Sequence, residues 1–150
     1  MKWMQTLSSR PSLFVSAALL AGCAAMGPVQ VNITGAEEVP PATTSATGSG
    51  SVTVGEDKSV SGSFKLQNAA HITAAHIHAG AAGKNGPVII PLQKSADNDW
   101  AVPPGAKLTD AQYESYKAGE LYVNFHSAKY KGGEIRGQIQ PGGGGRAMGY

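Results

Sequence analysis

The stretch Ser59-Val60-Ser61-Gly62-Ser63-Phe64-Lys65-Leu66 decides the fold class of this 150-residue chain. Valine, phenylalanine and leucine alternate in it with serine and lysine, a period of two that is typical of a strand with one buried face. Val52 and Val54 indicate a strand just before it. The polar residues Gly55-Glu56-Asp57-Lys58 between the two runs predict a hairpin loop.

Short apolar alternations of the same kind recur along the chain. They predict further strands at 29–34, 72–78, 88–92, 121–126 and 134–140. One helix is expected in addition, because Thr109 and Gln112 resemble a capping box and Gly119 suits a helix end. The sequence therefore predicts an all-β fold, an antiparallel Greek-key β-sandwich or barrel of about seven or eight strands with one short helix.

The first 22 residues predict a lipoprotein signal peptide. The apolar run at 13–21 follows a cationic start and is too short to span a membrane, which takes about 20 residues. Leu20-Ala21-Gly22-Cys23 resembles the bacterial lipoprotein signal, in which Cys23 is lipidated and becomes the first mature residue. An ordinary signal peptide that leaves a free cysteine is the alternative. Ala24 is not aspartate, which by the same resemblance indicates an outer-membrane anchor facing the periplasm.

The predicted mature chain has 128 residues (150 − 22), with ten Lys and Arg (12 − 2) against ten Asp and Glu. This balance argues against nucleic-acid binding. Cys23 is the only cysteine, so an intramolecular disulfide and a thiolate metal cluster are both excluded. We divide the mature chain into the lipidated cysteine and a tether at 23–28, one domain at 29–140, and a flexible glycine-rich tail at 141–150.

Two motifs bring histidines to the polar side of predicted strands. In Ala75-His76-Ile77-His78, strand alternation points both histidines to one side and the isoleucine into the core. In Leu121-Tyr122-Val123-Asn124-Phe125-His126, alternation likewise places His126 opposite the apolar face. The three imidazoles predict a site for copper, or alternatively zinc, with an open fourth position. A structural role, in which the histidines bond loop carbonyls, stays open.

Other polar residues are candidates to support this site. His71, five residues before His76, needs a bulge to join it, so we expect a surface residue and keep it as a possible extra ligand. If 127–133 forms a hairpin connection, Glu134 lies beside His126, and Arg136 lies beside Asn124, on one outward polar face. Glu134 then orients the imidazole and Arg136 attracts an anion. A polar ladder that only satisfies the sheet surface is the alternative.

Several spaced motifs together resemble one family, the CHRD domain named for the repeats of chordin. They are Gly35-Ala36-Glu37-Glu38-Val39-Pro40-Pro41, the Gly48/Gly50 pair, Ala75-His76-Ile77-His78-Ala79-Gly80, Gly86-Pro87-Val88, Leu121 to His126 and Gly133-Glu134-Ile135-Arg136-Gly137-Gln138-Ile139. The resemblance covers residues 29–140 and implies an all-β domain of a kind common in bacterial secreted proteins and lipoproteins.

A weaker similarity is to the Cu/Zn superoxide dismutase fold, in which a His-x-His strand and a later histidine hold copper. His76, His78 and His126 match that order, but a second histidine-rich loop with a zinc-binding aspartate, and a disulfide, are missing. We therefore expect a copper-binding envelope lipoprotein for storage, buffering or delivery. The alternatives are a non-catalytic module that binds a protein or glycan partner, and a dismutase-like copper enzyme.

Overall fold

The computed structural model describes residues 27–142 of the chain. The signal peptide predicted at 1–22, the lipidation site at Cys23 and residues 143–150 of the predicted tail lie outside the described residues. Within the described part, none of the helices is both long enough and apolar enough to cross a membrane.

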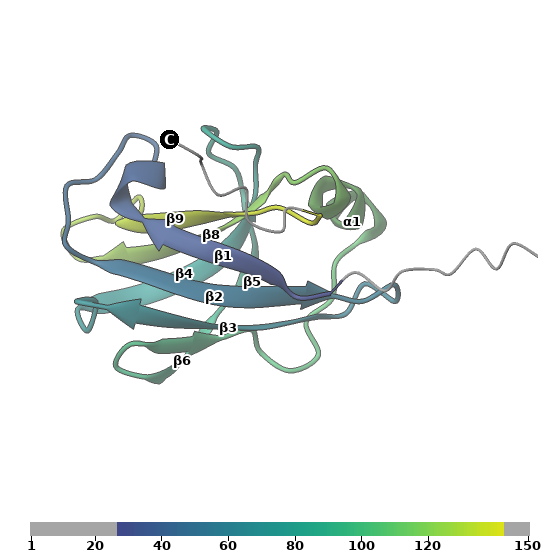
Figure 1. Ribbon diagram of the computed structural model, residues 1–150, viewed down its shortest axis with the longest axis horizontal. Helices are drawn as coiled ribbons and strands as arrows, with labels where there is room; N and C mark the ends of the chain where they lie inside the picture. Colours follow the sequence, from purple (N-terminus) through teal and green to yellow (C-terminus); the bar gives the residue numbers. More distant parts are fainter. Residues whose placement is uncertain (1–26, 143–150) are drawn as a thin grey trace, which may run out of the picture.

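Nine antiparallel strands form one sheet that curls into a nearly closed barrel (Figure 1). Across the sheet the strands follow the order β5-β4-β8-β9-β1-β2-β3-β7-β6. The elements are β1 (Val29–Thr34), the 3-10 turn η1 (Gly35–Glu37), β2 (Thr47–Val54), β3 (Val60–Gln67), β4 (Ile72–Ala79), β5 (Val88–Pro91), β6 (Gln93–Ala96), β7 (Asp99–Ala101), helix α1 (Asp110–Lys117), β8 (Leu121–Ser127) and β9 (Ile135–Ile139).

The all-β antiparallel prediction is confirmed, with nine strands in place of the expected seven or eight. The sequence prediction missed β6 and β7. All four residues of β6 are exposed, so the strand has no apolar alternation to detect. Strand β7 has only three residues, of which Trp100 alone is buried. Strand β7 depends on pairing with β3, and β6 depends on pairing with β7, rather than on a pattern of their own.

The predicted hairpin is present, with β2 and β3 paired without a break from Thr47↔Gln67 to Val54↔Val60. Strand β2 begins at Thr47, well before its two valines. Its first inward positions are the glycines Gly48 and Gly50, so this part of the strand shows no apolar alternation in the sequence. A Cβ atom on Gly50 would lie 2.4 Å from Cδ1 of Phe64. The bare backbone of β2 therefore makes room for the large side chains that β3 sends into the core.

The core fills the inside of the barrel. Phe125 of β8 meets Phe64 of β3 edge to face, with ring centroids 5.7 Å apart, and meets Trp100 of β7 at 6.1 Å. Aromatic side chains bury large apolar areas and stabilise such contacts further through their ring geometry. These three rings join the half of the sheet that carries the histidines to the half that does not.

A side chain of the edge strand β6 crosses the open seam of the barrel to the start of β4. Lys94 of β6 donates hydrogen bonds to the carbonyl oxygens of Ala70 and Ile72, each at 3.3 Å, next to the start of β4. The chain also crosses from β5 to β6 at Leu92, whose N–H donates to the carbonyl of Ala75 on β4. Three backbone carbonyls at the open seam are thus satisfied within the chain.

The helix begins and ends as the sequence predicts. The side chain of Thr109 accepts from the Gln112 N–H and the Gln112 side chain accepts from the Thr109 N–H, which completes the capping box. Gly119 follows the helix with φ of +73°. We predict that Thr109→Ala lowers the free energy of unfolding by about 1 kcal/mol. Urea denaturation measures this, and an unchanged midpoint would contradict it.

Candidate metal centre

The three predicted histidines meet on the outer face of the barrel. His76 and His78 lie on β4 and His126 lies on the neighbouring strand β8. The residue between the first two, Ile77, is 1% exposed and packs in the core, as the alternation predicts. One ring nitrogen from each histidine lies within 4.8 Å of the other two. Three imidazoles from two adjacent strands are therefore close enough to share one metal ion.

The register of β4 and β8 explains how the rings approach. His126 pairs with Ala74, whose small side chain leaves space above the sheet, and His76 pairs with Asn124. The His76 and His126 rings therefore meet on a diagonal, with His76 Nδ1 and His126 Nε2 3.1 Å apart. The His78 ring lies 5.6 Å from the His76 ring and 6.0 Å from the His126 ring, between centroids.

Two loop carbonyls determine which nitrogens are free to bind a metal. His78 Nδ1 lies 2.9 Å from the Gly86 carbonyl oxygen, and His126 Nδ1 lies 3.0 Å from that of Lys131. A carbonyl only accepts, so both Nδ1 atoms carry the proton and donate. Both Nε2 atoms therefore keep a lone pair. Histidine ligands in metal sites are held in the same way, by a hydrogen bond from the other ring nitrogen.

His78 Nε2 is buried and has no hydrogen-bond partner among the described residues. Burial also lowers the pKa values of His76, His78 and His126 below the ordinary histidine value. The three rings are therefore neutral near pH 7, the state in which imidazole binds metals. A buried lone pair without a partner costs free energy, which a metal ion in the cluster would recover.

Tyr122 packs beside the cluster and links it to Arg136. The Tyr122 ring stacks on His78 with centroids 4.8 Å apart and an interplanar angle of 11°. The Arg136 guanidinium carbon lies 3.4 Å from the centre of the same tyrosine ring. Tyr122 also accepts a hydrogen bond from the Gly86 N–H at 3.0 Å. The tyrosine thus contacts both His78 and the residue whose carbonyl orients it.

The expected pairing of Arg136 with Asn124 is present in the β8–β9 register. Glu134 and Arg136 are not exposed to solvent as residues of an open polar face would be, since they are 2% and 1% exposed. Arg136 is unavailable to a free anion because it donates to Asn85 Oδ1 and to two backbone carbonyls, at 2.8 Å for Lys84 and 3.2 Å for Ala81. Loops cover the strand face here, and their carbonyls take the place of water.

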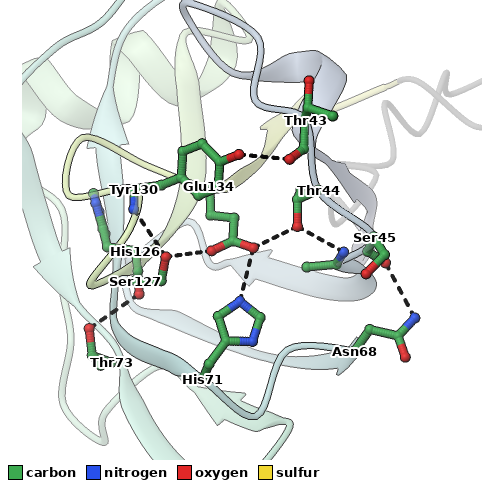
Figure 2. A network of polar contacts seen from close by, with 11 residues as sticks. Thr43, Thr44, Ser45, Asn68, His71, Thr73, His126, Ser127, Tyr130 and Glu134 are labelled. Carbon is green, nitrogen blue, oxygen red and sulfur yellow. Dashed lines mark hydrogen bonds and ion pairs between the residues drawn. The ribbon is translucent and has the colours of Figure 1, made fainter.

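Glu134 does not orient His126, whose Nδ1 bonds Lys131 instead. The Glu134 carboxylate accepts from Thr44 at 2.6 Å, from His71 Nε2 at 2.9 Å and from Ser127 (Figure 2). Burial works to raise its pKa, but the hydrogen bonds from Ser127, Thr44 and His71 hold the pKa of Glu134 below its usual value. His71 therefore lies on Glu134, apart from the cluster, and the network ties β8 to the segments before β2 and β4.

The site also contains groups that sequence reasoning missed. The Gly86 and Lys131 carbonyls that orient His78 and His126 are backbone atoms of loops, which leave no side-chain signal. A Cβ on Gly86 would lie 1.6 Å from the Ala79 carbonyl oxygen, so only glycine fits this close approach. The third is Glu38, whose buried carboxyl accepts from Asn124 Nδ2 at 3.3 Å. Asn124 thus donates its hydrogen bond to Glu38 rather than to a histidine.

Comparisons with known proteins show to which family the chain belongs. The family model of the CHRD domain matches residues 29–139, which include every described strand and the whole histidine cluster. No curated protein and no solved structure matches the chain. The match covers well over half of the 150 residues. The chain therefore belongs to the CHRD-domain family.

Proposed function

We propose that this protein binds a single copper ion through His76, His78 and His126. The observation that carries the proposal is the cluster itself, with three ligand nitrogens within 4.8 Å of one another and the buried His78 Nε2 lacking a partner among the described residues. The donor atoms are His78 Nε2, His126 Nε2 and, from its position facing His126, His76 Nδ1. All three rings are neutral, so none has to lose a net proton. The proton that His76 Nδ1 donates to His126 Nε2 in the metal-free protein has to move to His76 Nε2 before Nδ1 can bind the metal.

Copper is the metal that this donor set favours. Imidazole suits both copper and zinc, and copper binds more tightly to a given nitrogen site in the divalent series. Three histidines leave a fourth position for water or another ligand, as in open zinc sites, so zinc is the alternative. An open position also allows a metal to be passed on. We therefore infer a role in copper buffering or delivery rather than permanent structural binding.

The sequence supports a cellular setting for this role. Leu20-Ala21-Gly22-Cys23 suits lipidation at Cys23. We propose that the lipid anchors the domain to the outer membrane, with the histidine cluster facing the periplasm.

Metal titration of the purified protein tests the metal proposal. We expect about one copper per chain for the wild type and for His71→Ala, the matched control that removes a histidine outside the cluster. The triple variant His76→Ala/His78→Ala/His126→Ala should lose this binding while it stays folded by circular dichroism. Equal copper binding by the triple variant and the wild type would contradict the proposal and favour a module that binds a protein or glycan.

A further inference from the structure

A pair of buried oxygen atoms next to the cluster has no donor between them. Asn124 Nδ2 donates to Glu38 Oε2, but Glu38 Oε1 and Asn124 Oδ1 both lack a partner among the described residues. They lie 2.6 Å and 2.5 Å from the position that a Cβ atom on Gly133 would take, so they are neighbours. Glu38 is 4% exposed and Asn124 is 2% exposed. Two neighbouring buried acceptors without a donor are costly unless one of them gains a proton.

A protonated carboxyl resolves this arrangement. An O–H on Oε1 would donate to Asn124 Oδ1 while Asn124 Nδ2 donates to Oε2, which satisfies all four polar atoms at once. Burial favours the same state, since it raises the pKa of Glu38 to about 7 against the opposing effect of Arg136. Both the hydrogen bonding and the electrostatics of the site thus favour a neutral Glu38.

The charged groups around Glu38 come from three parts of the fold. The positive charge of Arg136 on β9 works to lower the pKa of Glu38, but the guanidinium donates its hydrogen bonds to other groups. Lys129, Tyr130 and Lys131 of the β8–β9 connection line a cavity of about 290 Å³ together with Glu38. His76 of β4 pairs with Asn124 in the sheet. The other buried acid in this region, Glu134, has a lowered pKa despite its burial, because it accepts hydrogen bonds from Ser127, Thr44 and His71, so it is already charged. Glu38 is therefore the buried acid that can gain a negative charge here.

We propose that Glu38 holds a proton on Asn124 in the metal-free protein and releases it when a cation occupies the histidine cluster. The inference rests on the proposed metal binding. The O–H bond of Glu38 breaks, the proton passes to solvent, and the carboxylate that remains partly balances the charge that the metal brings to three neutral imidazoles. Glu38 and Asn124 are both buried, and Asn124 is the cross-strand neighbour of His76, so the carboxylate charge is screened less than it would be at the surface. The Glu38–Asn124 pair therefore adds a pH dependence to metal binding, which is distinct from the one that protonation of the histidines causes.

Proton release on metal binding tests the coupling. Titration calorimetry with Cu(II), repeated at about pH 6.5 in buffers of different ionisation enthalpy, counts the protons released per metal. We expect the wild type to release roughly half a proton or more beyond Glu38→Gln. The amide that this substitution introduces can donate to Asn124 Oδ1 and accept from Nδ2, so the variant keeps the pairing without the titration. Any protons from the histidines are common to both proteins and cancel in the difference.

The outcomes separate this inference from the proposed function. Copper binding with equal proton release by both proteins would overturn the coupling and leave the metal site standing. Absence of copper binding in both would overturn the proposed function and the release step together. Carboxyl carbon NMR of the metal-free wild type checks the first half of the proposal independently. Titration of Glu38 near neutral pH is expected, and titration at the ordinary glutamate value would overturn the shared proton.

Discussion

Arg136→Met is expected to lower the free energy of unfolding by about 3 kcal/mol. The guanidinium is 1% exposed and donates to the Ala81 and Lys84 carbonyls and to the side chains of Asn85 and Gln138. Methionine fills part of the volume but supplies no donor, so these acceptors lose their partner together. Hydrogen bonds from a charged group contribute more than neutral ones, and orphaned buried acceptors add a further penalty. Urea denaturation measures the loss.

The matched control is Lys65→Met, which removes another cation from a strand. Lys65 has a side chain that is 79% exposed, and its ion pair with Asp99 spans 3.5 Å. We expect this variant to stay within about 0.5 kcal/mol of the wild type, because exposed ion pairs contribute little. An Arg136→Met protein as stable as Lys65→Met would show that water satisfies the loop carbonyls and that Arg136 is dispensable for stability.

Glu38→Gln is expected to stabilise the protein at alkaline pH and to leave its stability unchanged in acid. The folded protein holds a proton on Glu38 up to about pH 7, whereas the unfolded chain loses it above 4.5. Between these values the folded state binds more protons, so the stability of the wild type falls as pH rises. The shift corresponds to about 3 kcal/mol, fully lost above the folded pKa. Glutamine does not titrate and avoids this loss.

Unfolding curves of the metal-free proteins at about pH 4 and about pH 8 measure this difference. Glu37→Gln is the matched control, because the neighbouring residue is exposed and undergoes the same chemical change. We expect a gain at the higher pH for Glu38→Gln alone. An equal gain for both variants would assign the effect to the overall charge of the protein, and no gain for either would refute the buried proton.

Alternation in β4 and β8 was enough to predict where the three histidines point. A strand fixes the side of every second residue, so Ile77 and Phe125 in the core require His76, His78 and His126 to lie on the opposite face. The pattern cannot show what covers that face. Glu38, which follows η1, bonds Asn124, and the loop before β5 bonds Arg136. Both residues are buried, although they occupy positions that alternation marks as polar.

The partners of these polar residues depended on chain segments distant in sequence. Glu134 bonds His71, 63 positions earlier, and Asn124 bonds Glu38, 86 positions earlier. Loop paths set these contacts, and loops carry no periodic signal. Backbone carbonyls such as those of Gly86 and Lys131 are present at every residue, so composition does not reveal which of them will orient a histidine. The positions of the three histidines were thus accessible from the sequence, and their supporting contacts were not.

The lysine bridge at the barrel seam bears on how the domain behaves when many copies are held close together. An open sheet edge offers carbonyl oxygens to the strand of a neighbouring molecule, which is how β proteins begin to polymerise. Lys94 takes up the Ala70 and Ile72 carbonyls of its own chain and leaves a positive charge where another strand would have to dock. The seam therefore resists strand exchange, and copies of the domain can crowd on a surface as separate molecules.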